Sequence, residues 1–353
     1  MEAKFKRFTL KFIEPMGTSR GILRERETHI LGLENAAGTL GLGECAPLTG
    51  LSIDDRPHLA QKLQAVCDQL NDGKSADELD LSDWPAIQFG VETALLDLRA
   101  GGTQLLFDTS FTRGTRLIAT NGLIVMGQAD HMLRQVVDKV AAGFRCIKIK
   151  VGALKFDDEC RLLTEVRKQF PPRQIELRLD ANGAFDEDEA LEKLKRLSEF
   201  TVHSLEQPIK AGRWQAMARL CCESPIAIAL DEELIGIETL AERRELLQTI
   251  RPQFIILKPT LLGGFESAQV WIDLAETCDI GTWVTSALES NVGLNSISQW
   301  TSTRVCNRVQ GLGTGRLYQT NFASALSLRE GALHYDPRRA PSPPADLSQL
   351  QLQ

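Results

Sequence analysis

The sequence lacks several features that would assign it to particular classes of protein. It has no run of 18 or more apolar residues, and its start, MEAKFKRFTLKF, lacks the apolar core of a signal peptide. Basic residues interleaved with aromatics form no stripe, and the net charge of -7 disfavours binding to nucleic acid. The eight cysteines lie in apolar contexts without CxxC spacing, which is typical of reduced, buried thiols. We therefore expect a cytoplasmic protein that binds neither membrane nor nucleic acid.

The length of 353 residues is enough for a barrel of roughly 200–250 residues and a smaller second domain. Residues 1–112 are predicted to form that smaller α+β domain. Their alternating segment RERETHILGLENAAGTLGLGECAP predicts strands around a turn near Asn35–Gly38, and helical patterns follow at 55–70 and 86–100. The last residues, from Tyr335, are rich in Pro, Ser and Gln, and we expect segment 318–353 to return to this domain.

Polar residues recur in the second half of the chain at intervals of 25 to 30 residues, each at the end of a short apolar run. A strand, a helix and two loops need about that many residues, because a barrel of eight such units has ~250 residues. Functional side chains of such barrels lie at the C-terminal ends of the strands. Residues 113–317 are thus predicted to form a barrel that binds a small anionic molecule at a mouth formed by Lys150, Asp180, Glu206, Asp231, Lys258, Ser286 and Gly313.

Lys148 and Lys150 lie in the segment CIKIK, whose alternation places both lysines on one face of a strand. Two neighbouring ammonium groups repel each other and are partly desolvated, and both effects lower a lysine pKa towards the range of a useful base. A lone KxK is more often a solvated strand edge. Here the other face is apolar and carboxylates follow in later units, so we place both lysines in the mouth.

Asp180, Glu206 and Asp231 end three consecutive predicted strands. Oxygen donors without a histidine or cysteine beside them favour a hard cation such as Mg²⁺ over zinc. The alternative is that the acids serve only as ion-pair partners of the lysines. Burial of such a cluster without a functional reason is costly, because desolvation can exceed the Coulombic gain.

Five motifs in this order resemble the strand ends of the enolase superfamily, in its muconate-cycloisomerase-like subgroup: KIKVG, RLDANGAF, SLEQPI, ALDEEL and LKPTLLGG. The resemblance implies a modified TIM barrel, (β/α)7β, with an N-terminal α+β capping domain. It implies a Mg²⁺ site, in which Mn²⁺ is a possible substitute, at Asp180, Glu206 and Asp231. It also implies acid and base roles for Lys150 and Lys258.

The segments TSALESNVGLNSISQW and GLGTGRLY further resemble the o-succinylbenzoate synthases of menaquinone biosynthesis. Their reaction removes water from 2-succinyl-6-hydroxy-2,4-cyclohexadiene-1-carboxylate to give 2-succinylbenzoate. Dipeptide epimerases of the same subgroup carry Asp-x-Asp on the last barrel strand, where this chain has GLGTG at 311–315. A glycine-rich strand end instead lets backbone N–H groups approach an anion closely, although a tight turn would need the same glycines.

The roles that follow for a syn dehydration are specific. Lys150, kept neutral by the metal and by Lys148, would remove the α-proton and return it to the departing hydroxide, while Lys258 would remain cationic and stabilise the enediolate. One of Glu232 and Glu233 would support Lys258 or the metal ligands. The loops PMGTSRG and APLTGLS are predicted lids. The candidate substrate-binding residues are Asn182, Ser286, Gly313 and Arg20.

Two other functional hypotheses stay open at this point. An N-succinylamino acid racemase or another muconate-type cycloisomerase would use the same lysines and metal. A non-catalytic binding protein on this scaffold is disfavoured by the presence of both lysines and all the carboxylates. The oligomeric state is also open.

Overall fold

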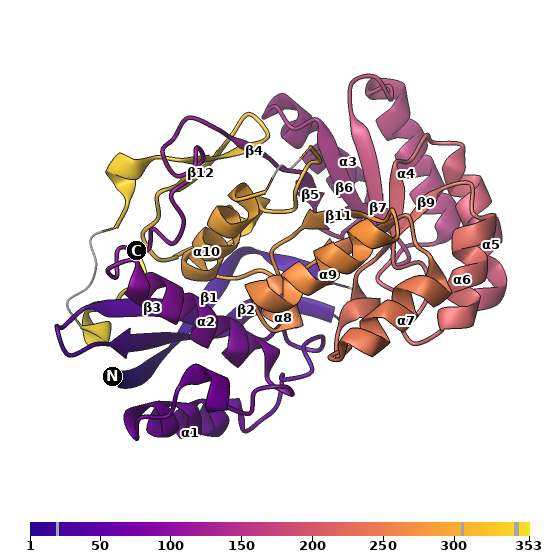
Figure 1. Cartoon of the computed structure of the whole chain (residues 1–353). Helices are drawn as coiled ribbons and strands as arrows, with labels where there is room; N and C mark the ends of the chain where they lie inside the picture. The colour runs from indigo at the N-terminus through magenta and orange to yellow at the C-terminus, as the bar shows by residue number, and fades with distance from the viewer. Residues whose placement is uncertain (19–20, 305–306, 342–345) are drawn as a thin grey trace.

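The computed structural model describes residues 1–18, 21–304, 307–341 and 346–353 of the chain. Figure 1 shows an N-terminal antiparallel sheet with its helices beside a barrel of strands and surrounding helices. This is the modified TIM barrel with an α+β capping domain that the motifs predicted.

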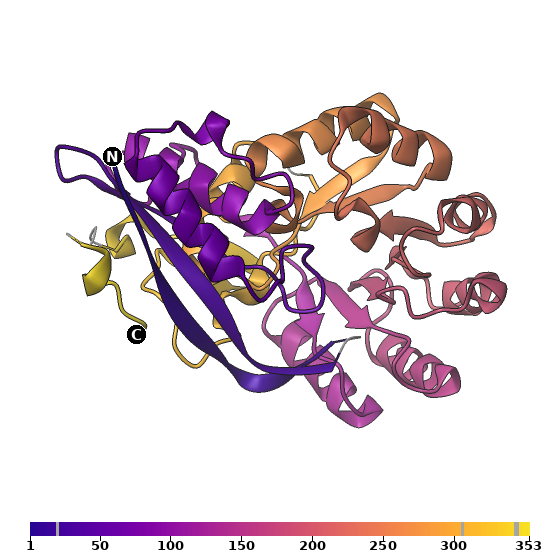
Figure 2. The same cartoon turned by 90° about the horizontal axis from the view of Figure 1, so that it is seen from below.

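The capping domain is built on a long antiparallel ribbon, which Figure 2 shows running across the molecule. The side chain of Asn35 accepts hydrogen bonds from the backbone N–H groups of Ala37 and Thr39, each at 3.0 Å, and so closes the tight turn that follows the ribbon. Helices pack their apolar stripes on one face of the sheet. The elements are β1 (Glu2–Thr18), β2 (Gly21–Glu34), β3 (Leu40–Cys45), α1 (Leu59–Asn71), η1 (Ala76–Glu78) and α2 (Pro85–Arg99).

The barrel strands are parallel and follow each other around the sheet in chain order. Each is short, and most are rich in Ile and Leu, as expected for strands covered on both faces. They are β5 (Gly122–Ile124), β6 (Cys146–Lys150), β7 (Glu176–Asp180), β8 (Ser204–Glu206), β9 (Ala227–Leu230), β10 (Phe254–Leu257) and β11 (Gly281–Val284).

Amphipathic helices surround these strands, and Figure 2 shows several of them in an arc around the outside. Their apolar sides join the outer faces of the strands in one large hydrophobic core. The helices are α3 (Ala129–Ala141), α4 (Phe156–Gln169), α5 (Glu187–Ser198), α6 (Trp214–Glu223), α7 (Leu240–Ile250), α8 (Pro259–Leu262), α9 (Phe265–Thr277) and α10 (Asn291–Ser302), with the short turns η2 (Glu232–Leu234) and η3 (Gly313–Arg316).

The barrel is closed by the short segment Gln310–Gly311. Gln310 forms a parallel bridge with Thr120, just before β5, and Gly311 forms one with Thr285, just after β11. The backbone N–H of Gly311 donates to the carbonyl of Val284 at 2.8 Å. Because this segment touches both edges of the sheet, the first and last units share one mouth.

The bottom of the barrel interior is filled by rings rather than by catalytic groups. His203 stacks on Phe254 with ring centroids 5.2 Å apart, and the guanidinium of Arg178 lies 4.3 Å from the ring of Trp283. These contacts make His203 a packing residue of the barrel floor.

The C-terminal residues contact both parts of the molecule. The hairpin of β12 (Leu326–Arg329) and β13 (Ala332–Tyr335) pairs with β4 (Ile118–Ala119) beside the barrel. After η4 (Pro337–Arg339), η5 (Leu347–Gln349) packs Leu347 against the capping sheet. No helix in the described ranges is long and apolar enough to span a membrane.

Candidate active site

The strand register places charged side chains of β6, β7 and β8 side by side at the barrel mouth. Lys148 and Lys150 lie on β6, Asp180 ends β7 and Glu206 ends β8. Lys150 is opposite Asp180, and Asp180 is opposite Glu206. Both acids are almost fully buried, with exposed fractions of 1% and 3%. Residues that recur at regular intervals in the sequence therefore lie side by side at the barrel mouth.

Lysines neutralise these acids. The Nζ of Lys148 lies 3.0 Å from Asp180 Oδ2 and 2.6 Å from Glu206 Oε2. The Nζ of Lys150 lies 3.3 Å from the same Asp180 oxygen. Each ammonium group therefore offsets part of the desolvation cost of a buried carboxylate.

Asp231 and Lys258 occupy the corresponding positions on the next strands. Asp231 follows β9 and Lys258 follows β10, and their side chains form an ion pair. Among the described residues, no His, Cys, Asp and Glu side chains form a ready-made metal-binding group of three or more. The predicted metal ligands are instead bound to the lysine ammonium groups of the same mouth.

The electrostatics of the mouth correct one prediction. We expected the pKa of Lys148 to be lowered, but it is raised, because Asp180, Glu206 and Asp231 together outweigh the effect of burial. Burial also opposes the charge of Lys258, whose pKa is nevertheless raised, mainly by Asp231. Repulsion by Lys148 also lowers the pKa of Lys258, but this effect is smaller than those of burial and of the carboxylates of Asp231, Glu206 and Glu232.

The carboxylates respond in opposite directions. Burial tends to raise the pKa of Asp180, but Lys148 and Lys150 outweigh it and hold this pKa below its usual value. Burial raises the pKa of Glu206 well above normal, and the negative charge of Asp180 adds to this shift. The ionised form of Glu206 is therefore the less favoured of the two carboxylates in this arrangement.

Asn182 connects Lys150 to the loop after β9. Its backbone has a positive φ of 44°, and its N–H donates to Asp180 Oδ1 at 3.0 Å. Its side-chain oxygen accepts a hydrogen bond from Lys150 Nζ, while its Nδ2 donates to Glu232 Oε1 at 2.9 Å. Glu232 thereby fixes which end of the amide faces Lys150.

Glu233 supports the acids through Gln207, a residue that the sequence did not single out. The Nε2 of Gln207 donates to Glu233 Oε2 at 2.9 Å, and its Oε1 accepts from the N–H of Asp231 at 3.2 Å. Gln207 directly follows Glu206, so this fully buried amide ties the ends of β8 and β9 together. Its position in SLEQPI, next to a predicted ligand, was the available signal.

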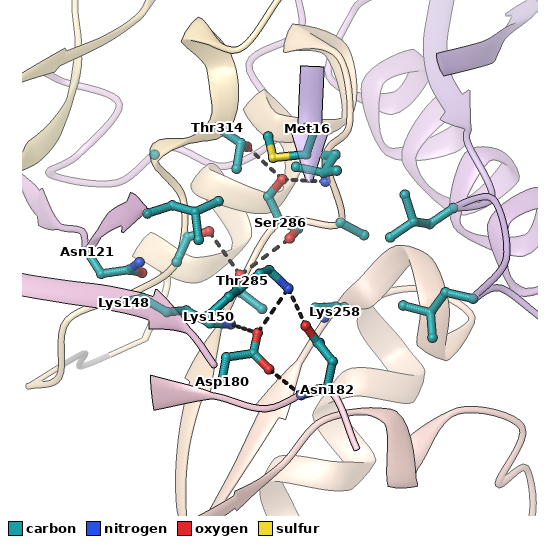
Figure 3. Close-up of a pocket in the computed structure, with 17 residues that line it drawn as sticks. Met16, Asn121, Lys148, Lys150, Asp180, Asn182, Lys258, Thr285, Ser286 and Thr314 are labelled. Carbon is teal, nitrogen blue, oxygen red and sulfur yellow. Dashed lines mark hydrogen bonds and ion pairs between the residues drawn. The ribbon is translucent and has the colours of Figure 1, made fainter. Parts of the chain in front are cut away.

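A cavity of about 120 Å³ lies at this mouth (Figure 3). Lys150, Lys258, Asp180 and Asn182 lie at one end of it, and Ser286 with Thr314 at the other. Apolar residues of both predicted lid loops complete the wall: Met16, Leu48 and Leu51. The cavity can therefore hold a molecule with one anionic end near the lysines and an apolar body.

The far end of the cavity is polar but carries hydroxyl groups instead of charges. Ser286 Oγ lies 2.7 Å from Thr314 Oγ1, and the backbone N–H of Leu288 donates to Ser286 Oγ at 3.0 Å. Gly313 also lines the cavity. The sequence did not identify Thr314, Asn121 or Thr285, which line the same cavity and are near neighbours of strand-end residues.

The predicted arginine, Arg20, lies outside the described residues. A different arginine of the capping domain, Arg26, is 3% exposed and donates to the carbonyl oxygens of Ala46 and Ala287. No motif marked it, because its partners lie 20 and 261 residues away in the sequence.

Comparison with known proteins assigns both parts of the chain. Residues 131–336 match the family described as Enolase C-terminal domain-like, and residues 2–98 match the family MenC, N-terminal domain. The o-succinylbenzoate synthase of Desulfotalea psychrophila is 44% identical, over 94% of this chain and 98% of that protein. That of Thermosynechococcus vestitus is 30% identical, over 72% of this chain and 74% of the relative.

Solved structures agree with this assignment. The crystal structure of MenC from Desulfotalea psychrophila superposes with a TM-score of 0.85 at 41% identity, and the match covers 95% of this chain and 99% of that chain. The L-Ala-D/L-Glu epimerase of Bacillus subtilis superposes with a TM-score of 0.82 over 95% of this chain and 97% of that chain. At 20% identity, that second likeness shows the fold alone.

Proposed function

We propose how this chain, which belongs to the o-succinylbenzoate synthase family of the enolase superfamily, uses its barrel mouth for catalysis. The chain is an o-succinylbenzoate synthase, a hydro-lyase of menaquinone biosynthesis. It removes water from 2-succinyl-6-hydroxy-2,4-cyclohexadiene-1-carboxylate and forms the aromatic 2-succinylbenzoate. The observation that carries the mechanism is a cavity with lysines and buried acids at one end and neutral hydroxyl groups at the other.

The family depends on a divalent cation, and we assign Mg²⁺, with Mn²⁺ as a substitute, to Asp180, Glu206 and Asp231. The residues fit such an ion, because they offer buried carboxylate oxygens on neighbouring strands. The raised pKa of Glu206, caused by burial and then by Asp180, indicates a site that would gain from further positive charge. When bound, the ion neutralises the ring carboxylate of the substrate and makes its α-proton removable.

Lys150 acts as the base and then as the acid. Its Nζ takes the proton from the ring carbon that bears the carboxylate, and the electron pair of that C–H bond enters the ring. The C–O bond at the adjacent carbon then breaks, and the same Nζ returns the proton to the departing hydroxide, so that water leaves and Lys150 is regenerated. Asn182 orients this amine through the hydrogen bond between its side-chain oxygen and Lys150 Nζ.

Lys258 contributes charge without transferring a proton. It extends from the end of β10, separated from Lys150 on β6 by β7, β8 and β9 in the sheet order. Its pKa is raised, against burial, mainly by Asp231, so the group is an ammonium ion that stabilises negative charge developing on the substrate. Ser286 and the backbone at Gly313 receive the succinyl carboxylate at the other end of the cavity.

The direct test is to incubate the protein with Mg²⁺ and the cyclohexadiene substrate and to record the aromatic absorbance of the product. We expect rapid, metal-dependent conversion that chelation abolishes reversibly, because oxygen ligands exchange Mg²⁺ readily. An absence of turnover with a folded, Mg²⁺-saturated protein would overturn the assignment.

A racemase is the second candidate, since Lys150 and Lys258 both line the cavity. Two opposed bases would exchange the α-proton of both enantiomers of an N-succinylamino acid with solvent deuterium. Each single lysine variant would then exchange one enantiomer only. Rapid dehydration without rapid exchange by the wild type excludes racemisation as the main activity, whereas rapid epimerisation with no dehydration would replace our assignment.

A further inference from the structure

We infer that Arg26, a buried residue of the capping domain, is a positioning residue for the substrate carboxylate that lies farther from the reaction. This inference rests on the proposed function, whose substrate carries one carboxylate on the ring and one on the succinyl chain. The lysines and acids at one end of the cavity take the ring carboxylate. The inference concerns what prepares the other end.

The two ends of the cavity differ in charge. Among the described residues that line it, the cationic side chains are Lys148, Lys150 and Lys258, which extend from the ends of β6 and β10. Ser286 and Thr314, at the opposite end, are neutral (Figure 3). A succinyl carboxylate placed there would lose solvation with only hydroxyl and backbone donors in return, which is costly unless positive charge lies nearby.

Arg26 provides that charge from directly behind the wall. Its side chain is 3% exposed, and its terminal nitrogens donate to the carbonyl oxygens of Ala46 and Ala287. These carbonyl partners are neutral, so they bind the terminal nitrogens without cancelling the charge of the guanidinium, while its Nε has no hydrogen-bond partner among the described residues. The buried carboxyl group of Glu44 also lies within electrostatic reach: burial raises its pKa, and the charge of Arg26 is one of the smaller effects that oppose this shift. Ala287 lines the cavity, so a cation is held one peptide group away from it.

A continuous hydrogen-bonded path leads from Arg26 into the cavity. The carbonyl of Ala287 and the N–H of Leu288 belong to one peptide group, and that N–H donates to Ser286 Oγ at 3.0 Å. Bonding of a cation to the carbonyl polarises this peptide group and strengthens its N–H as a donor. Because Ser286 Oγ accepts from Leu288, its own proton is available to Thr314 Oγ1, 2.7 Å away, or to a ligand carboxylate.

The rest of the turn is held in place by other buried groups. Leu288 has a left-handed φ of 66°, which an L-residue adopts only when its surroundings impose it. The hydroxyl of Tyr318 donates to the carbonyl of Leu288, and Glu289 Oε2 accepts from the N–H of Ala287 at 2.8 Å. Glu44 of the capping domain accepts from the N–H of Ser290 at 2.8 Å. The capping domain thus contributes the charge at this end of the cavity through Arg26, and it helps to hold the shape of the turn through Glu44.

The test compares steady-state constants for the cyclohexadiene substrate in wild type, Arg26→Met and Arg26→Lys. Loss of a charge-assisted hydrogen bond should raise KM by about 10- to 100-fold. The value of kcat should change by less than about threefold, because the succinyl carboxylate does not react and is bound equally in the ground and transition states. Arg26→Lys, which keeps the charge, should recover part of the loss. Arg24→Met, an exposed position two residues earlier on β2, is the matched control and should leave both constants unchanged.

A double-mutant cycle with Ser286→Ala separates this role from a merely structural one. If Arg26 acts through Ser286, Arg26→Met should change KM by less than about threefold once Ser286 is Ala. Equal effects of Arg26→Met in both backgrounds, or a fall in kcat and thermal stability with KM unchanged, would overturn the inference. If Arg26→Met does not fold, the same cycle is run with Arg26→Lys. A wild type that does not convert the substrate would overturn the proposed function itself, so the two failures are distinct.

Discussion

At the residue scale, the barrel mouth contains buried lysines and carboxylates, and the charge state of each group depends on its neighbours. Asp180 is bound by Lys148 and Lys150, and Asp231 by Lys258. Glu206 has Lys148 as its ion-pair partner, and its pKa remains raised by burial and by Asp180. Removing one charge therefore changes the electrostatic environment of several others, and effects of single substitutions will not add.

The first prediction concerns the proposed metal ligands. Asp180→Asn or Asp231→Asn keeps the shape of the side chain but removes a charge, so Mg²⁺ binding should be lost. Activity should then fall by at least about a hundredfold, as for loss of a preorganised electrostatic group. Calorimetric Mg²⁺ titration and turnover at limiting metal measure this, with circular dichroism as the folding control. Near-normal turnover of either variant at limiting Mg²⁺ would show that the ligands are wrongly assigned.

The second prediction separates the two catalytic lysines. Lys150→Ala removes both base and acid and should lower kcat by about 10²–10⁴-fold, the usual contribution of general acid–base catalysis. Lys258→Ala removes only electrostatic stabilisation and should cost about 10²–10³-fold. An added small primary amine should restore activity to the first variant more than to the second. Equal rescue of both, or a negligible effect of Lys150→Ala, would contradict the assigned roles.

The site residues that were predicted from the sequence differ from those that were missed in what determines their position in the structure. Lys150, Asp180 and Glu206 were predicted at the mouth because a strand end fixes their position, whatever the rest of the chain does. Gln207 and Arg26 instead contact backbone groups that folding brings near them. Arg26 and Ala287 are 261 residues apart in the sequence, and a contact between such distant residues leaves no local sequence pattern. The direction of the Lys148 pKa was mispredicted for the same reason, since it depends on distances that the sequence does not contain.

At the element scale, the barrel strands and the first two helices followed from hydrophobic periodicity, whereas the closest contacts between elements did not. The helical patterns at 55–70 and 86–100 correspond to α1 and α2, and the turn near Asn35–Gly38 joins β2 to β3. The closure of the barrel by Gln310–Gly311 was not predictable from periodicity, because a pair of bridged residues is too short to show a pattern. The close contacts made at the glycines of LGLGEC, which alternate on β3, were likewise not predictable from periodicity.

The third prediction tests what those glycines do. A Cβ added at Gly43 would collide with the carbonyl of Gly90 on α2, and one at Gly41 would collide with the carbonyl of Ala94. Gly43→Ala must push α2 away from the sheet and should destabilise the protein by about 1–3 kcal/mol, the usual cost of overpacking. Gly32→Ala on β2 is the control, since the nearest atom, 3.0 Å away, is the end of the flexible Leu40 side chain. Denaturant unfolding measures both, and equal stability of the two variants would refute the close-packing explanation.

At the scale of the whole molecule, the capping domain and the barrel are joined by buried polar groups as well as by apolar packing. Glu44 of β3 binds the start of α10, and Arg26 of β2 binds the turn before it. Met16 and Leu48 extend from the capping domain into the cavity wall. The capping domain thus contributes to the active site, and a change at the interface between the two parts is expected to affect substrate binding as well as stability.

The last prediction concerns one of these contacts and its dependence on pH. Glu92 of α2 accepts hydrogen bonds from the N–H groups of Phe265 at 2.5 Å and Glu266 at 3.0 Å, at the start of α9 in the barrel. Burial raises the pKa of Glu92 from 4.5 to about 7, although these two donors favour the ionised form. A carboxyl group whose pKa is higher in the folded state stabilises the fold fully below its unfolded pKa. That contribution is lost as the pH rises through the folded pKa.

The wild type should therefore lose stability relative to Glu92→Gln between about pH 4.5 and pH 7.5. The difference should amount to at most about 3 kcal/mol, since each pKa unit corresponds to about 1.4 kcal/mol. Denaturant unfolding of both proteins at pH 5 and pH 8 measures it, and the amide, which does not titrate, cancels the contributions of all other groups. A difference in unfolding free energy that stays constant over this range would show that Glu92 is already ionised at pH 5. In that case the two N–H donors, and the positive end of the α9 dipole, outweigh burial at this contact.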